Sequence, residues 1–132
     1  PLKVQFNQDN IHNVHLIHGT GERVLNELIP NDSLSKVFLF HPDPWFKKRH
    51  INRRVIQLEF LSLLKQKLSS NGRFYVSTDV ELLWEYMSDN LLEAGFAKVD
   101  DLFWTTDYTS HWSMFSEKDL RTQYYSAWEY ST

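Results

Sequence analysis

A proline-rich turn and a cationic run join an apolar strand pattern to a long helical pattern in the middle of this chain. The strand pattern is Val37-Phe38-Leu39-Phe40, whose β-branched and aromatic side chains favour extended backbone. The turn that follows, His41-Pro42-Asp43-Pro44-Trp45, has two prolines, which remove two backbone donors and disfavour helix around Asp43. We therefore expect an α/β fold whose loop presents Asp43 at the carboxyl end of a strand, where open α/β sheets place their functional groups.

The residues after this turn carry a dense positive charge. Five Lys or Arg and one His lie between positions 47 and 54, although the net charge of the chain is only -3. Any affinity for RNA phosphates must therefore come from this local run. Purely structural interpretations stay open at this point. Pro-Asp-Pro is a common turn composition, a charge run is often a solvated face, and Trp45 can pack under the loop. Arg53 and Arg54 can also be ordinary first-turn residues of the next helix.

Composition excludes several classes of protein. The chain has 132 residues, of which 42% are hydrophobic, so it can form the core of one domain. It has no apolar run of the roughly 20 residues that span a bilayer, so we expect no membrane segment. The absence of cysteine is compatible with a cytoplasmic location. The six histidines show none of the spacings typical of metal sites, and we expect no metal.

The apolar spacing predicts the order of helices and strands. Parallel strands are expected at 13–17, 36–40 and 73–77, helices at 21–28, 52–69 and 79–93, and carboxyl-terminal antiparallel strands within 96–99, 102–104 and 123–130. Thr20 is suited to cap the first helix, and Gly72 to a left-handed residue after the second. Thr78 and Glu81 have the spacing of a capping box for the third helix, which leaves Asp79 available at the same sheet edge as Asp43. Gly95 is expected to end that helix.

The order of strand, Pro-Asp-Pro-Trp, Lys/Arg/His run and paired arginine resembles the signature of the bacterial tRNA (guanine-N7-)-methyltransferases. In that family a Phe precedes Pro-Asp-Pro-Trp, whereas His41 stands here, and Phe46 stands where the family often has Pro or His. Thr78-Asp79 also matches a Thr-Asp of the family, in which the Asp contacts the substrate. The family's Thr-x-Phe-Glu is only partly kept, since Ser113 preserves the hydroxyl and Ser116 replaces the acid.

The resemblance implies part of a Rossmann-like class I methyltransferase sheet, of order 3-2-1-4-5-7-6, with S-adenosylmethionine as the cofactor and tRNA as the substrate. Asp43 would then be catalytic. The residues implied to bind the substrate are Lys47, Arg49, Arg53, Arg54, Asp79 and Ser113. Gly19, Thr20 and Asp43 are those implied to contact the cofactor, although Thr20 stands where the family has an Asp.

The amino-terminal part of the family pattern is not found in these 132 residues, and the chain opens with Pro1 instead of Met. A first strand, a Gly-rich loop and an acid on the second strand normally hold the cofactor in this family. We therefore expect a single domain that is the carboxyl-terminal portion of a methyltransferase, incomplete alone, which self-associates or binds the missing amino-terminal half. The alternative is a truncated or degenerate relative that binds RNA or a partner without catalysis. Thr20 and Ser116 favour this alternative, whereas Pro-Asp-Pro-Trp and Thr78-Asp79 favour the enzyme.

Overall fold

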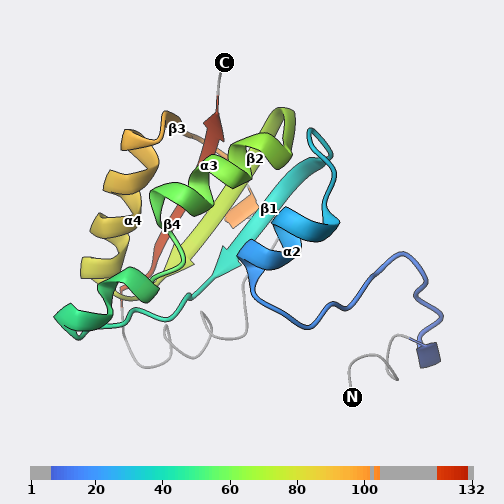
Figure 1. Ribbon diagram of the computed structural model, residues 1–132, viewed down its shortest axis with the longest axis horizontal. Helices are drawn as coiled ribbons and strands as arrows, with labels where there is room; N and C mark the ends of the chain where they lie inside the picture. Colours follow the sequence, from blue (N-terminus) through green and yellow to red (C-terminus); the bar gives the residue numbers. More distant parts are fainter. Residues whose placement is uncertain (1–6, 102, 105–121, 131–132) are drawn as a thin grey trace.

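The computed structural model describes residues 7–101, 103–104 and 122–130. Its centre is a four-stranded sheet of order β1-β2-β4-β3 (Figure 1). The strands are β1 (Leu34–Phe40), β2 (Leu68–Thr78), β3 (Phe96–Val99) and β4 (Tyr124–Tyr130). β1 and β2 are parallel, whereas β4 is antiparallel to both β2 and β3. The expected parallel pairing and the antiparallel carboxyl-terminal strands are therefore confirmed, which gives the α/β sheet of a partial methyltransferase fold.

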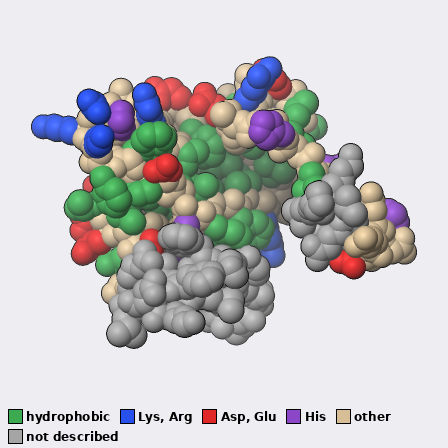
Figure 2. Space-filling model, turned by 90° about the horizontal axis from the view of Figure 1, so that it is seen from below, with side chains coloured by type: hydrophobic (Ala, Val, Ile, Leu, Met, Phe, Trp, Pro, Cys, Tyr) green, Lys and Arg blue, Asp and Glu red, His purple; other side chains and the backbone are tan. Residues whose placement is uncertain are grey.

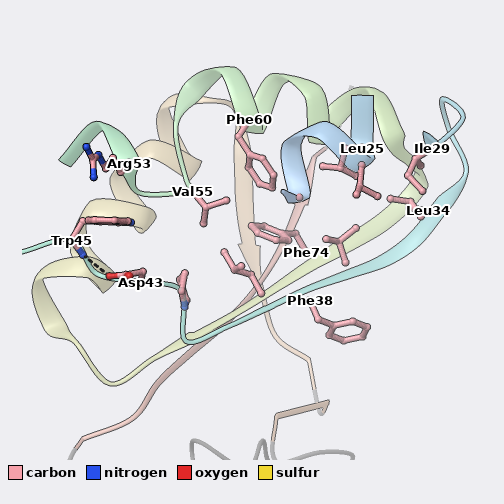
Figure 3. Close-up of a pocket in the computed structure, with 15 residues that line it drawn as sticks. Leu25, Ile29, Leu34, Phe38, Asp43, Trp45, Arg53, Val55, Phe60 and Phe74 are labelled. Carbon is pink, nitrogen blue, oxygen red and sulfur yellow. Dashed lines mark hydrogen bonds between the residues drawn. The ribbon is translucent and has the colours of Figure 1, made fainter. Parts of the chain in front are cut away.

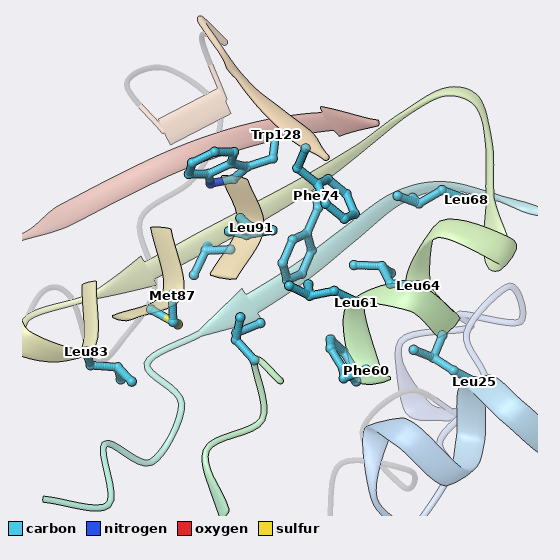
Figure 4. Packing of buried hydrophobic residues seen from close by; sticks show 13 residues of the cluster. Leu25, Phe60, Leu61, Leu64, Leu68, Phe74, Leu83, Met87, Leu91 and Trp128 are labelled. Carbon is cyan, nitrogen blue, oxygen red and sulfur yellow. The ribbon is translucent and has the colours of Figure 1, made fainter. Parts of the chain in front are cut away.

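In the described part of the chain, the α-helices that cover one face of this sheet are α2 (Gly21–Leu28), α3 (Leu58–Lys67) and α4 (Glu81–Glu93). They enclose a core of buried side chains between the helices and the sheet (Figure 4). Phe74 of β2 and Trp128 of β4 point into this core, where they meet Leu61, Leu64 and Leu91 of the helices. Burial of these large apolar groups supplies most of the driving force for folding.

Helix α2 has the predicted bounds, because its sequence carries both a cap and an apolar face. The side chain of Thr20 accepts a hydrogen bond from the backbone N–H of Arg23 at 3.2 Å, and Leu25 is buried. Gly95 likewise ends α4 as expected, with a φ of 93° that favours glycine. None of the helices in the described part of the chain has both the length and the apolar composition that a membrane crossing requires.

The predicted helix 52–69 is wrong at its start. Residues 48–53 instead form a separate 3₁₀ helix, η1 (Lys48–Arg53), and α3 begins only at Leu58. Between them the side chain of Gln57 donates from Nε2 to the carbonyl oxygens of Ile51 and Arg54, both at 3.0 Å. These bonds satisfy the carbonyl groups at the end of η1, so the chain can leave the helical path there.

Two local predictions near β2 are also wrong. The left-handed residue is Asn71, with a φ of 63°, and Gly72 lies inside the strand. Glycine is needed there because a Cβ atom would lie 2.9 Å from the carbonyl oxygen of Ser69 and 3.0 Å from that of Leu34. The capping box does not form either, since Val80 precedes α4 without a side-chain cap and Thr78 Oγ1 accepts from the N–H of Val80 at 3.1 Å.

The strand predicted at 13–17 does not form. This segment has no regular structure, and the side chains of Val14, Leu16 and Ile17 are 44%, 48% and 49% exposed. A strand needs a neighbour to pair with its backbone groups, and within the described residues no strand lies beside this segment. The strand predicted at 102–104 does not form at Phe103 or Trp104, and residue 102 lies outside the described residues.

Candidate functional site

The loop after β1 begins with a strained turn. The backbone N–H of His41 donates to the carbonyl oxygen of Ser77 at 2.8 Å, which extends the pairing of β1 with β2 by one residue. The φ angles of His41 and Trp45 are 46° and 44°, a left-handed conformation that is uncommon outside glycine. Such strain costs energy and tends to concentrate at functional sites, so the turn between these residues is a candidate site.

Asp43 lies at the exposed centre of this turn. Its Oδ1 accepts a hydrogen bond from the backbone N–H of Trp45 at 3.2 Å, drawn as a dashed line in Figure 3. The turn-forming role that the sequence left open is therefore real. A carboxylate has about four acceptor positions, and this bond uses one of them. Asp43 can thus shape the turn and still accept hydrogen bonds from a ligand.

Trp45 lies between the turn and η1. Its ring is 5.5 Å from the ring of His50, edge to face, and the guanidinium of Arg53 lies 5.2 Å from its centroid. Figure 3 shows Arg53, Trp45 and Asp43 following one another along one side of the pocket. The aromatic ring therefore connects the acid of the turn to the cations of η1.

The basic run forms an exposed positive surface. Lys47, Lys48, Arg49 and Arg53 are all exposed, and in the part of the chain that the structure describes none has a carboxylate within ion-pair distance. Figure 2 shows Lys and Arg side chains gathered at one end of the molecule, the end at which η1 lies in Figure 1. Cations that are not neutralised by a nearby carboxylate are available to RNA phosphates. We call these four residues the basic surface.

Arg54 differs from this surface, although it is next to Arg53 in the sequence. It is only 8% exposed, its Nε donates to the carbonyl oxygen of Pro44 at 2.7 Å, and its guanidinium lies 4.6 Å from the ring centroid of Tyr86. These contacts tie the strained turn to helix α4. Sequence reasoning left open whether Arg54 is a helix residue or a phosphate ligand, and its burial favours a structural role.

Asp79 lies directly after β2, so it shares the carboxyl edge of the sheet with the loop after β1. Unlike Asp43 it is enclosed: its side chain is 6% exposed, and its Oδ1 lies 3.9 Å from Nδ1 of His41, whose side chain is 8% exposed. Sequence reasoning did not find this contact. The only indication of this contact in the sequence is that His41 stands where the family motif has Phe.

A mostly apolar pocket of about 470 Å³ opens beside the turn. Its walls come from α2, β1 and α3, while Asp43, Trp45 and Arg53 lie at one end (Figure 3). The pocket has one carboxylate for a ligand as polar as S-adenosylmethionine, which carries an ammonium group and a ribose diol. Gly19 and Thr20 are exposed and do not line it, and the side chain of Thr20 caps α2.

The residues implied to contact the cofactor therefore do not fit together as a cofactor site within the described part of the chain. Ser113, implied to bind the substrate, lies outside the described residues. What the structure does bring to one edge of the sheet is Asp43, Asp79 and the basic surface.

Comparison with known proteins decides the family. A family model described as "Putative methyltransferase" matches residues 2–127. This chain belongs to that methyltransferase family. Similar proteins include the tRNA (guanine-N(7)-)-methyltransferase of Shewanella amazonensis, 45% identical over 83 residues, and that of Salmonella typhi, 40% identical over 86 residues. These matches cover 63% and 65% of this chain but 33% and 34% of the relatives. The motif resemblance is confirmed, and the chain spans about a third of the length of the methyltransferases it matches.

Proposed function

We propose that this chain forms the tRNA-facing, carboxyl-terminal portion of an enzyme that transfers a methyl group from S-adenosylmethionine to N7 of a guanine in tRNA. The relatives carry the name of this enzyme. The observation that carries the proposal is the meeting of Asp43, Asp79 and the basic surface at the carboxyl edge of two parallel strands. Carboxylates suit a base that becomes cationic during methylation, and a positive surface beside them suits the phosphate backbone that carries this base. A tRNA substrate also fits a cytoplasmic location.

The chemistry of guanine N7 needs little from side chains in the way of proton transfer. N7 of neutral guanine has a lone pair and no proton, so it can attack an activated methyl group without a general base. Catalysis then depends on positioning and electrostatics. The carboxylate of Asp43 can accept hydrogen bonds from the guanine N1–H and exocyclic amine, and its charge favours the base as it becomes cationic. Asp79 offers a second acceptor.

The basic surface would track the tRNA backbone. Phosphate contacts fix the orientation of the nucleic acid, and acceptors for base edges choose the base. In this proposal Arg54 does not contact RNA, and it holds the turn in place through its hydrogen bond to Pro44. Ser113 remains a proposed substrate contact.

The open side of the sheet points to a covering partner. Within the described residues β1 pairs only with β2, and beside this free edge Phe38 and Phe40 are 41% and 37% exposed. The pocket beside β1 is also mostly apolar, and Phe38 is among the residues that line it (Figure 3). Unpaired strands with exposed apolar flanks promote association. We propose that the amino-terminal half of the methyltransferase covers this edge and that the isolated chain otherwise self-associates.

The test is methyl transfer from labelled S-adenosylmethionine to unmodified tRNA, with the product nucleoside identified. We expect the full-length protein to form 7-methylguanosine and the 132-residue chain alone to form none. Methylation of another base or atom would contradict the proposed reaction. Robust activity from the short chain would contradict the proposal that it is only a portion of the enzyme.

A further inference from the structure

Two aromatic residues are adjacent in the sequence where the basic surface begins, and the fold uses them differently. The ring of Trp45 is partly buried, with the guanidinium of Arg53 5.2 Å from its centroid and the ring of His50 5.5 Å away, edge to face. Phe46 is 67% exposed, the largest exposed fraction among the large apolar side chains that the structure describes. Trp45 is therefore engaged with the fold, whereas Phe46 exposes most of its apolar side chain to solvent.

The neighbours of Phe46 are the groups that the proposed site consists of. The exposed carboxylate of Asp43 precedes it by three residues, and the basic surface begins at the next residue, Lys47. The Cα atoms of Phe46 and Asp43 are no more than about 11 Å apart, because three residues of chain reach no further. If one nucleotide is bound at Asp43, the next nucleotide of the same strand is therefore within reach of Phe46.

An exposed aromatic ring beside cations has the chemistry of a site for single-stranded nucleic acid. Every base has a flat face that stacks on aromatic side chains, while Lys and Arg bind the phosphates along the backbone. In a duplex the faces of the bases are covered by their neighbours, so an unpaired or extruded nucleotide is needed for such stacking. Enzymes that act on a base commonly take it out of the stack, which also uncovers the face of the base next to it.

We propose that Phe46 stacks on an unpaired base next to the target guanine of the tRNA, while the basic surface holds the flanking phosphates. This proposal rests on the proposed function, since it takes the ligand to be tRNA. The family pattern often has Pro or His at this position, so the resemblance itself implies no role for Phe46. The contact is made both before and during methyl transfer, so it affects KM for tRNA and leaves kcat nearly unchanged.

The first arm of the test measures RNA binding without methyl transfer. The full-length protein is titrated with single-stranded oligouridylate and with an abasic oligomer of the same length, which keeps the phosphates and lacks the bases. We expect Phe46→Ala to weaken binding of oligouridylate about tenfold, as for the loss of one stacked base, and to leave binding of the abasic oligomer unchanged. Lys47→Ala/Arg49→Ala should weaken binding of both oligomers.

Three further variants separate stacking from the mere loss of exposed apolar area. Phe46→Trp keeps a stacking ring and should bind oligouridylate at least as well as the wild type. Phe46→Leu keeps apolar area without a ring and should lose as much affinity as Phe46→Ala. Leu82→Ala is the matched control, because Leu82 is 65% exposed on helix α4, and it should leave binding of both oligomers unchanged.

The second arm measures methyl transfer to tRNA by the full-length protein. We expect Phe46→Ala to raise KM for tRNA about tenfold and to change kcat by less than about twofold. A loss confined to kcat would mean that Phe46 acts on the reacting base and would overturn the proposal.

The proposal would also be overturned if Phe46→Ala weakened binding of both oligomers equally or of neither, or if Phe46→Leu kept the affinity of the wild type. An exposed aromatic ring beside cations also suits an anionic membrane, so vesicles that contain phosphatidylserine are a third ligand. Vesicle binding that depends on Phe46, with oligouridylate binding that does not, would contradict the proposal.

Failure of the proposed function has a different appearance. The wild-type protein would then methylate no tRNA, while Phe46→Ala would still lose affinity for oligouridylate and keep its affinity for the abasic oligomer. If the stacking proposal alone fails, the wild type forms 7-methylguanosine and Phe46→Ala binds oligouridylate as the wild type does.

Discussion

Two clusters of side chains in this molecule differ in whether their cations are paired with carboxylates. On the face of the sheet away from the helices, Arg73 donates to Glu129 at 2.8 Å and also to Asp101, while the hydroxyl of Tyr75 donates to Asp101 at 2.7 Å. On the basic surface, the cations have no carboxylate within ion-pair distance in the described part of the chain. We call the first group the Arg73 cluster. Its charges are neutralised within the fold, whereas those of the basic surface are not.

Protonation equilibria in the Arg73 cluster reflect this mutual pairing. Burial by itself would raise the pKa of Asp101, but hydrogen bonds from the N–H of Phe103, from Tyr75 and from Arg73 outweigh it, and the pKa is lowered. Burial, followed by the hydrogen bond to Asp101, raises the pKa of Tyr75 to about 12. Charged groups that are paired with opposite charges stabilise the fold, whereas cations without a nearby carboxylate can be neutralised by a ligand. The comparison therefore indicates a folding role for the Arg73 cluster and supports the proposed binding role of the basic surface.

The sharpest way to break this assignment is to replace the acid next to the basic surface. Asp43→Asn keeps the shape of the turn but removes the charge and offers an amide donor where guanine already presents donors. We expect a loss of order 10² in turnover by the full-length protein, as for other single preorganised electrostatic groups. Full activity in the variant would remove Asp43 from the mechanism.

The same variant should leave the fold almost unchanged. Asp43 is exposed, and the hydrogen bond that its side chain accepts from the N–H of Trp45 can be accepted equally by the amide oxygen of Asn. We expect the free energy of unfolding to change by less than about 0.5 kcal/mol. A large loss of stability would mean that Asp43 belongs with the folding residues.

A second test separates two adjacent arginines. Arg54→Ala removes the bond to Pro44 and the contact with Tyr86 from a site that is 8% exposed, and we expect it to destabilise the chain by about 2 kcal/mol. Arg53→Ala is the matched control, because Arg53 is exposed, and it should cost less than about 0.5 kcal/mol. Urea unfolding of both variants measures the difference. Equal losses would contradict the division between a structural and a binding arginine.

These arginines also show what sequence can and cannot predict. Helix α2 and the pairing of β1 with β2 were predictable, because a cap and apolar runs mark them locally. No local sequence feature distinguishes Arg53 from Arg54. Arg54 is buried because it contacts Pro44 and Tyr86, which are not its neighbours in the sequence. The start of α3 depended on the side chain of Gln57 in the same way.

The candidate site likewise has one part that the sequence predicts and another that only the fold shows. The motif identified Asp43, Asp79 and the basic run, because their order along the chain is itself the signal. The contact of His41 with Asp79 joins residues that are distant in sequence, so only the fold shows it. The strand at 13–17 failed for a related reason: its apolar pattern is real, but a strand also needs a neighbour beside it.

A third test concerns the Arg73 cluster. Tyr75→Phe removes a buried donor to Asp101, and we expect a loss of about 1 kcal/mol in the free energy of unfolding near neutral pH. The pKa of Tyr75 is raised by folding, so its contribution is complete below about pH 10, the ordinary pKa of tyrosine, and is lost as the pH rises through its folded value of about 12. The advantage of the wild type over Tyr75→Phe should therefore shrink between pH 10 and 12. Urea unfolding at pH 8 and at pH 11 measures it, and an advantage that is constant with pH would contradict the assignment.

The smallest expected effect is also the most direct measure of the basic surface. If Lys47 and Arg49 contact phosphates, each should release counterions from the RNA, so the logarithm of tRNA affinity should fall linearly with the logarithm of salt concentration. Lys47→Ala/Arg49→Ala should then lower the slope by about 0.7 to 0.9 for each lost contact.

The matched control for this measurement is a lysine outside both clusters. Lys98 is also exposed, but its ammonium lies 5.1 Å from the ring centroid of Trp84, on strand β3 and outside the basic surface. Lys98→Ala therefore removes the same charge from the chain as one of the two substitutions, while leaving the proposed phosphate contacts in place. Because long-range attraction depends on net charge and counterion release depends on local contact, only the double variant should change the slope. An unchanged slope in that variant, or an equal change with Lys98→Ala, would mean that the basic run is solvated surface and that unpaired charge alone does not identify a binding site in this fold.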